Sequence, residues 1–332
     1  MIRPSTWGPL LATAAALLCS SVCVEPASAC SICLAGDPVF DATGTSVGEV
    51  GQWNLFIQGS GWEKTSGALP HHAPGDEHEE HPATEENTSQ RLDLSLGWTP
   101  IDRLTLTLNV PFAFNHIKEI EEGVHEHFSL SGLGDVSLLG SVVLWRNRDV
   151  LPGTWVEGRA FLKTPTGKSH ERVGGVKDPH LQPGTGSWDF GGGLAAAHQL
   201  PLGSLYASAS YRVNTEGSLD YEYGDSALAN AAVLVPLPSA TGVPWLAPFT
   251  AGAELNYRWA GRDEFHGQNY KDSGGSILYA TPSLRIALAA LAIGERLPPS
   301  LRFSLQVPLT NRWLHGQQEE RLLWRAGLLV PF

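Results

Sequence analysis

The stretch Arg321-Leu322-Leu323-Trp324-Arg325-Ala326-Gly327-Leu328-Leu329-Val330-Pro331-Phe332, at the end of the chain, decides the fold class. Counting back from its last residue in steps of two gives an unbroken apolar row, which lies on one face of an extended strand because side chains alternate between faces. The other face carries Arg321 and Arg325, with Leu323 and Leu329 as apolar exceptions. This pattern is typical of the closing strand of a bacterial outer-membrane β-barrel, and the alternative is an edge strand of a soluble β-sandwich.

The same two-residue period recurs along the chain and favours the barrel. We predict strands near residues 51–61, 91–98, 104–112, 135–145, 155–164, 188–199, 205–213, 227–235, 248–259, 276–288, 301–309 and 321–332. Only a closed barrel leaves no unpaired backbone edge in lipid, and single-chain bacterial barrels have an even number of strands. The sequence therefore predicts an all-β fold, a transmembrane antiparallel up-and-down β-barrel of about twelve strands.

The N-terminus has the features of a secretory signal peptide. Arg3 precedes the apolar run Leu10–Leu18, and Ala27-Ser28-Ala29 forms a small-residue cleavage site. The apolar run is shorter than the roughly 20 residues that a membrane-spanning helix needs. We predict a signal peptide at 1–29, a periplasmic N-terminal segment with a Cys-x-x-Cys motif at 30–50, and the outer-membrane barrel at 51–332.

The net charge argues about possible binding partners, and the loop lengths predict which end of the barrel faces the periplasm. The formal net charge is -12 and no basic cluster occurs, which argues against nucleic acid as a partner. Outer-membrane barrels have short periplasmic turns and long outer loops. The predicted periplasmic turns are Thr99–Asp102, Arg146–Pro152 and Pro201–Gly203, and the predicted outer loops are Gly61–Thr88, Asn115–Gly132, Pro165–Gly186 and Gly261–Gly275.

Charged residues occupy the polar faces of several predicted strands. A dry sandwich core would not tolerate them, whereas a water-filled barrel lumen accepts them at little cost. The predicted lumen-lining residues are Arg91, Asp93, Glu157, Arg159, Lys163, Arg212, Glu254, Arg258, Arg285 and Arg302. Mixed charges of this kind produce a transverse field that selects small polar or ionic solutes by size and charge.

Seven of the 12 histidines lie in the first two predicted outer loops, among many carboxylates. Imidazole and carboxylate ligands suit Cu and Zn, so these loops are candidate metal-binding segments. A solvated acidic loop and a pH sensor are the alternatives, and the spacing of His78 and His81 is not that of an HExxH motif. The candidate metal ligands are His71, His72, His78, His81, His125 and His127, together with Cys30 and Cys33.

Cys30 and Cys33 allow three interpretations. A close cysteine pair in an exported protein favours a disulfide. The same pair provides two of the four ligands of a tetrahedral metal site. Ala27-Ser28-Ala29-Cys30 also resembles a weak lipidation signal. Because Cys30 precedes the first strand, we expect it on the periplasmic side, away from the histidine-rich loops.

The predicted strands offer no arrangement for nucleophilic catalysis. His198, in a predicted strand, has no serine partner on a neighbouring tight hairpin. We therefore predict that the protein is not an enzyme, with a barrel-anchored esterase as the alternative.

Three short motifs carry a resemblance to a known family. They are Ser131-Gly132-Leu133-Gly134-Asp135-Val136, Lys163-Thr164-Pro165-Thr166-Gly167 and Leu181-Gln182-Pro183-Gly184-Thr185-Gly186-Ser187-Trp188-Asp189. In this order, and with the closing strand, they resemble the outer-membrane transporter family linked to the MetA pathway of phenol degradation. The resemblance implies an outer-membrane barrel of transporter type. The cysteine pair and the histidine-rich loops are not part of this resemblance, and they favour a function that involves metals.

Together these features predict a barrel in the bacterial outer membrane that contacts lipid and passes a small-molecule solute. The predicted function is a channel or transporter for small polar, ionic or aromatic solutes with a link to metals. The alternative is a Cu- or Zn-binding surface protein with histidine-rich loops, for which the barrel is only an anchor.

Overall fold

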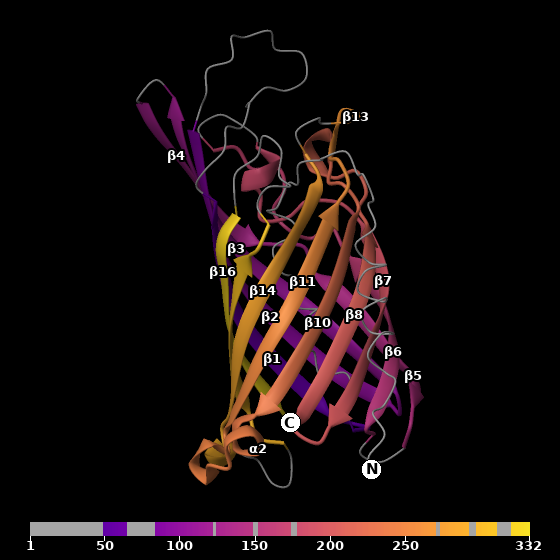
Figure 1. Ribbon diagram of the computed structural model, residues 1–332. Helices are drawn as coiled ribbons and strands as arrows, with labels where there is room; N and C mark the ends of the chain where they lie inside the picture. Colours follow the sequence, from indigo (N-terminus) through magenta and orange to yellow (C-terminus); the bar gives the residue numbers. More distant parts are fainter. Residues whose placement is uncertain are drawn as a thin grey trace, which may run out of the picture.

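The computed structural model describes residues 49–64, 84–121, 124–148, 152–173, 178–269, 273–291, 297–310 and 320–332. It shows an all-β barrel that is elongated along the strand direction (Figure 1). No helix in these ranges is long and apolar enough to cross a membrane. Cys30, Cys33, His71, His72, His78 and His81, the signal peptide and most of the segment 30–50 lie outside the described residues.

Twelve strands within the described ranges form a closed antiparallel ring, in the order β1-β2-β3-β5-β6-β7-β8-β10-β11-β14-β15-β16 and back to β1. The ring strands are β1 (Trp53–Lys64), β2 (Thr84–Ile101), β3 (Leu104–Glu121), β5 (Ser137–Arg146), β6 (Thr154–Lys163), β7 (Asp189–Leu200), β8 (Gly203–Val213), β10 (Ser226–Pro236), β11 (Phe249–Ala260), β14 (Gly275–Ala287), β15 (Ser300–Pro308) and β16 (Glu320–Pro331). The predicted fold class and strand count are confirmed.

The remaining described elements lie outside this ring. They are β4 (Val124–Leu133), β9 (Tyr221–Glu222), β12 (Glu264–Phe265), β13 (Gln268–Asn269), α2 (Leu237–Thr241), η2 (Pro179–Leu181), η3 (Ser218–Asp220), η4 (Pro244–Leu246) and η5 (Ala289–Leu291). The sequence did not predict α2 and η4, which form the link between β10 and β11. Pro238 and Pro244 occupy first-turn positions, where the missing backbone N–H is not needed.

The barrel closes where the last strand pairs with the first. β1 and β16 run antiparallel in register from Asn54 opposite Pro331 to Gly61 opposite Trp324. Trp53 and Phe332 exchange both backbone hydrogen bonds, at 3.0 and 2.8 Å. The chain therefore leaves neither strand edge open at the seam, as the terminal alternation indicated.

Side chains alternate between the outside and the interior of the barrel. On β2, Leu92, Leu94 and Leu96 are exposed on the outer surface, whereas the intervening Asp93 and Ser95 are buried. The same inversion holds on β16, where the apolar Trp324 is exposed. Outward apolar and inward polar residues are the reverse of a soluble domain, and this arrangement suits a barrel surrounded by lipid.

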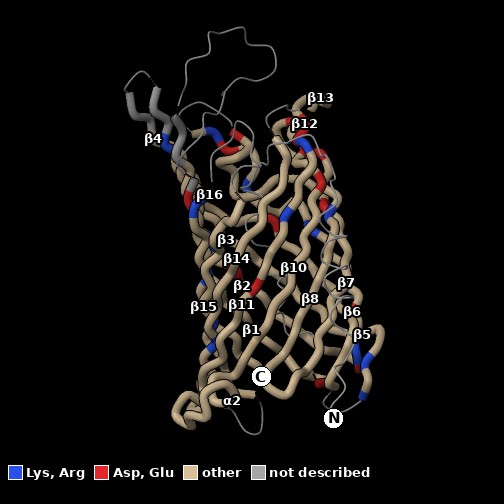
Figure 2. The backbone as a smooth tube through the Cα atoms, in the orientation of Figure 1, with Lys and Arg blue, Asp and Glu red and all other residues tan. Residues whose placement is uncertain are grey.

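The two ends of the barrel differ. Short turns at Ile101–Leu104, 146–154 and 200–203 lie at one end, which we call the short-turn end. The longer links 164–188, 214–225 and 261–274 lie at the other, which we call the long-loop end (Figure 1). Many charged residues are at the long-loop end (Figure 2).

The predicted outer loop Asn115–Gly132 is instead an extension of the sheet. The outer half of β3 pairs with β4 from Phe112 opposite Leu133 to Glu121 opposite Val124, and β2 continues on the other side of β3. This extension projects beyond the rim of the barrel (Figure 1). One face of the extension carries His116, Lys118, His127 and Ser129, whereas Ile117 on the other face is buried.

The outward position of Leu255, in the middle of β11, generates a stability prediction. Leu255→Arg should lower the free energy of unfolding by about 2 to 4 kcal/mol, because a charged side chain then faces the lipid midplane. Urea unfolding in lipid vesicles, followed by tryptophan fluorescence, measures the change. Leu255→Val is the matched control and should stay near the wild type, and equal midpoints for all three proteins would contradict the orientation of β11.

Candidate functional site

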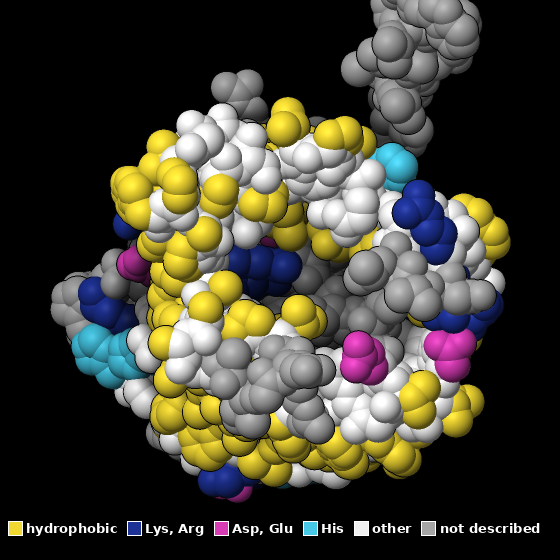
Figure 3. Space-filling view, turned by 90° about the horizontal axis from the view of Figure 1, so that it is seen from below, with side chains coloured by type: hydrophobic (Ala, Val, Ile, Leu, Met, Phe, Trp, Pro, Cys, Tyr) yellow, Lys and Arg dark blue, Asp and Glu magenta, His cyan; other side chains and the backbone are white. Residues whose placement is uncertain are grey.

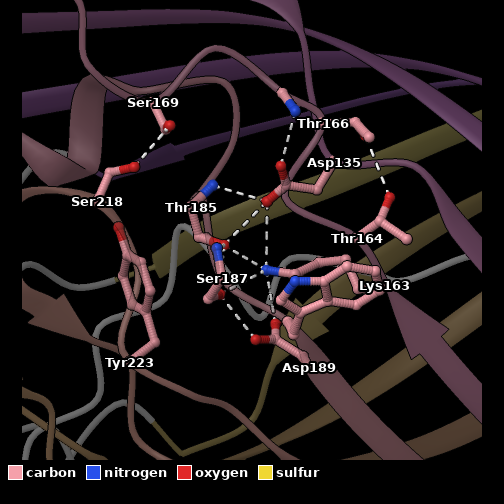
Figure 4. A network of polar contacts seen from close by, with 12 residues as sticks. Asp135, Lys163, Thr164, Thr166, Ser169, Thr185, Ser187, Asp189, Ser218 and Tyr223 are labelled. Atoms are coloured by element: carbon pink, nitrogen blue, oxygen red, sulfur yellow. Dashed lines mark hydrogen bonds and ion pairs between the residues drawn. The ribbon is translucent and has the colours of Figure 1, made fainter.

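The three motifs that carried the family resemblance meet at one point of the long-loop end. Asp135 comes from the break between β4 and β5, Lys163 from the end of β6, and Thr185, Ser187 and Asp189 from the segment entering β7 (Figure 4). We call these five residues the clasp. They are separated by up to 54 positions in the chain, from Asp135 to Asp189, and the sequence predicted only Lys163 as a site residue, in the lumen lining.

Asp135 holds the two ends of the segment 164–188 together. Its carboxylate accepts hydrogen bonds from the backbone N–H of Gly167 at 2.8 Å and of Thr185 at 2.7 Å, and from the Thr185 hydroxyl at 2.9 Å. Its side chain is only 3% exposed. A buried carboxylate is stable only when its oxygens are satisfied in this way.

Lys163 lies between two carboxylates of the clasp. Its Nζ is 3.3 Å from Asp135 Oδ2 and 2.6 Å from Asp189 Oδ2, and it donates a 3.2 Å hydrogen bond to Ser187 Oγ. Ser187 in turn donates to Asp189 Oδ1 at 2.8 Å. The clasp therefore contains two acidic groups and one basic group, with one negative charge in excess.

The glycines of the motifs allow this close approach. A Cβ added at Gly167 would lie 2.6 Å from the backbone carbon of Gly134, and one at Gly184 would lie 2.7 Å from Asp135 Oδ1. Neither position has room for a side chain, because the neighbouring atoms are backbone or clasp atoms. Close packing thus explains why these motifs contain glycine.

From the clasp, the described part of the segment 164–188 reaches the inner side of β3. The 3-10 turn η2 reaches β3, where Asn115 Nδ2 donates to the carbonyl oxygens of Leu181 and Gln182 at 3.1 and 3.2 Å. Asn115 is an inward residue of β3 and is itself held by the Ser89 hydroxyl at 2.7 Å. Two ring strands, β5 and β6, separate β3 from β7, so these contacts hold the segment over one side of the interior.

An aromatic cluster joins this segment to the other long links. Tyr221 and Tyr223, near β9, have ring centroids 4.8 Å apart, and His180 of η2 packs edge-on against both. Tyr221 donates a 2.6 Å hydrogen bond to Asp263, and Tyr223 donates a 3.0 Å bond to the Pro179 carbonyl. The links 164–188, 214–225 and 261–274 are therefore interlocked above the interior.

Within the barrel, one wall is rich in arginine. Arg302 on β15 forms an ion pair with Glu254 on β11 at 2.9 Å, and both Arg258 and Arg325 donate to Gln306 Oε1, at 3.0 and 3.2 Å. Arg285 lies directly opposite Arg302 in the register of β14 and β15. Figure 3 looks into the short-turn end, which is hollowed at its centre and has Lys and Arg side chains inside the hollow.

The opposite wall is more apolar. Leu139 on β5 and Phe161 on β6 are buried and pack with Leu228 of β10, and the Arg212 guanidinium lies 4.7 Å from the centre of the Phe161 ring. Glu157 pairs with Arg159 on the same strand and is 1% exposed. One Glu157 oxygen, Oε2, has no hydrogen-bond partner among the described residues.

The structure gives each residue that was predicted to line the lumen a position in the ring. All ten lie on ring strands, at the inward positions of the alternation. The buried residues are Asp93, Glu157, Arg159, Lys163, Glu254 and Arg258, and the partly exposed ones are Arg91, Arg212, Arg285 and Arg302. Lys163 is set apart from the others because it belongs to the clasp.

The predicted metal ligands are only partly described. His127 lies on β4, and His125 lies two residues earlier on the same strand, although its side chain is not described. Within the described residues, no group of three or more histidine, cysteine, aspartate or glutamate side chains could hold a metal ion. The strand residue His198 is at the short-turn end, where its Nδ1 lies 2.8 Å from the Thr154 hydroxyl.

Comparison with known proteins establishes the fold. No protein-family model matches the chain, and no curated protein matches its sequence. A solved outer membrane channel from Pseudomonas putida F1 is 15% identical, covers 88% of this chain and 99% of its own, and superposes with a TM-score of 0.61. This is the fold of an outer-membrane channel, and the protein belongs in the bacterial outer membrane.

Two further solved structures are more distant. A mutant of the monoaromatic hydrocarbon channel TodX is 10% identical, covers 86% of this chain and 91% of its own, and has a TM-score of 0.41. A FadL homologue from Pseudomonas aeruginosa is 11% identical, covers 93% and 97%, and has a TM-score of 0.37. The outer-membrane barrel implied by the resemblance is confirmed by the match to the Pseudomonas putida channel, whereas the particular family, its pathway and its transport role stay predictions.

The clasp generates a prediction about the segment that it holds. Asp135→Asn removes one of the two carboxylates around Lys163 and leaves an amide that cannot accept from all its present donors. The free energy of opening of the segment should fall by about 3 to 5 kcal/mol, as for other broken buried ion pairs. Hydrogen exchange at the Gly167 and Thr185 amides measures this opening.

Asp102→Asn is the matched control for the clasp. Asp102 also pairs with a cation, Arg146 at 3.1 Å, but its side chain is 62% exposed. An exposed pair contributes about 0 to 1 kcal/mol, so exchange at the long-loop end should not change. Equal effects of the two substitutions would contradict a special role of the clasp.

Glu222, on β9, generates a pH prediction outside the membrane-spanning strands. Burial raises the pKa of the Glu222 carboxyl, and the charges of Glu264, which lies opposite in register, and of Asp225 raise it further. A raised folded-state pKa contributes stability below the unfolded-state pKa, and this contribution is lost as the pH rises through the folded-state value. The small sheet of β9, β12 and β13 should therefore be more stable at mildly acidic than at neutral pH.

Hydrogen exchange in β9 and β12, corrected for the intrinsic pH dependence, tests this. Glu222→Gln should remove most of the dependence, whereas Glu171→Gln, which changes an exposed acid in the segment 164–188, should leave it in place. A wild-type sheet that becomes more stable as the pH rises would show that the sign is wrong.

Proposed function

We propose that this protein is a passive outer-membrane channel for small polar, ionic or aromatic solutes. The observation that carries the proposal is the arginine-rich inner wall of β11, β14, β15 and β16, in which Arg302, Arg258 and Arg325 each have a polar partner. A barrel used only as an anchor has no need for buried charges, which are costly to desolvate unless paired. A hydrated pathway accepts them easily.

The arrangement of charge supports a selective pathway. The arginine wall occupies four neighbouring strands of the ring, and the apolar wall with Phe161 and the Glu157–Arg159 pair lies on the other side. A solute that passes between them meets cationic donors on one side and aromatic or aliphatic surface on the other. We infer that the predicted lumen residues act in this way, by charge and size rather than by a tight site.

The segment 164–188 is the proposed constriction of the channel. We place the long-loop end outside the cell and the short-turn end in the periplasm, following the rule that outer loops are long. The clasp and the Asn115 contacts hold the segment over one side of the interior at that end. Its position determines how wide an opening a solute meets when it enters.

Single-channel recording in planar bilayers tests the proposal. The purified barrel should produce discrete conductance steps, and a barrel that inserts but remains electrically silent would overturn the proposal. Arg258→Gln combined with Arg325→Gln should shift the reversal potential in a salt gradient toward that of cations, with a several-fold change in the permeability ratio, because two fixed positive charges leave the wall.

Arg148→Gln is the matched control for the selectivity measurement. Arg148 is exposed in the turn after β5 and does not face the interior. Its replacement should leave the permeability ratio unchanged. If the control shifts the ratio as much as the double variant, the inner wall does not determine selectivity.

A further inference from the structure

The sheet extension formed by β3 and β4 carries two histidines on one face. His116 on β3 lies opposite Ser129 on β4, and His127 on β4 lies opposite the next residue but one of β3, Lys118. His116 and His127 are therefore diagonal neighbours on two paired strands. The extension projects past the rim of the barrel (Figure 1), so this face is not part of the inner wall described above.

The two imidazole rings lie at a distance that one metal ion can span. Their centroids are 5.6 Å apart and their planes are 17° from parallel. With metal–nitrogen bonds of about 2.0 to 2.1 Å, the centroids of two imidazoles on one ion are separated by roughly 5 to 6.4 Å, depending on the bond angle.

Ser129 orients the first of these rings. Its hydroxyl lies 2.7 Å from His116 Nδ1. When Nδ1 carries the proton and donates it to this hydroxyl, Nε2 has a free lone pair. Histidines that bind metals commonly donate from their second nitrogen to such a partner, which fixes the tautomer and the orientation of the ring.

We propose that His116 and His127 form a metal-binding site on the outer face of the β3–β4 extension, and that its ligand is a divalent transition-metal ion. Neutral imidazole suits Cu²⁺, Ni²⁺ and Zn²⁺, and the affinity of a nitrogen site for these ions is highest for Cu²⁺. The site differs in place and chemistry from the inner wall, so it does not depend on the proposed channel activity. Lys118, next to His127, opposes cation binding by its charge and limits the affinity.

Cu²⁺ titration of the full barrel in detergent tests the site. The background protein carries Cys→Ser at positions 30 and 33 and His→Gln at positions 71, 72, 78 and 81, so that the other predicted ligands do not contribute. It should bind one Cu²⁺ ion, with an electron paramagnetic resonance spectrum that shows coupling to at least two nitrogens. His116→Gln and His127→Gln should each lower the affinity at least tenfold, because chelation requires both rings.

Two further variants complete the design. Lys118→Gln removes the neighbouring positive charge and should raise the affinity for Cu²⁺, whereas His198→Gln, at the other end of the barrel, should not change it. All variants are checked for folding by heat-modifiable mobility in electrophoresis. The proposal is overturned if the background protein binds no Cu²⁺, or if each single substitution reduces binding by twofold or less, as expected for histidines that act independently.

Discussion

The structure depends above all on the pairing of the first strand with the last. In lipid, every backbone N–H and C=O must find a partner within the protein, since no water is present to replace it. β1 and β16 provide that closure, and Trp53 and Phe332 complete its final pair of hydrogen bonds. Closure also separates an interior from the lipid. Every second residue of each ring strand faces this interior, and the residues between them face the lipid. The apolar outer surface and the charged inner wall both follow from this separation of the interior from the lipid.

The interior is organised by the cost of burying charge. Glu254 pairs with Arg302, and Lys163 lies between Asp135 and Asp189, so each of these charged groups has a partner of opposite charge. At the long-loop end these contacts also position the backbone. Asp135 binds backbone amides at both ends of the segment 164–188, and so one carboxylate fixes the position of a whole link over one side of the interior. The glycines around it are needed because backbone atoms must come within contact distance of that carboxylate.

The same sheet serves two purposes along its length. Within the membrane, β3 has an apolar outer face and a polar inner face. Beyond the rim the inner face still buries Ile117, and the strand continues because β2 and β4 pair with it on either side. Freed from the requirement to contact lipid, the outer face there carries His116 and His127. The predicted loop at this position was therefore wrong about backbone structure, and the assignment of its histidines as metal ligands stays a prediction.

The sequence by itself determined the fold class, the number of strands, the closing pair and the inward or outward position of most strand residues. These follow from a local pattern with a period of two, which the lipid imposes on each strand independently. The clasp could not be predicted from this local pattern. Asp135 and Asp189 lie in glycine-containing motifs, Lys163 was predicted only to line the lumen, and nothing local indicates that a carboxylate will meet backbone amides 32 and 50 residues further along the chain. The diagonal pairing of His116 with His127 was equally hidden, because it depends on the register between two strands, and only the folded sheet decides that register.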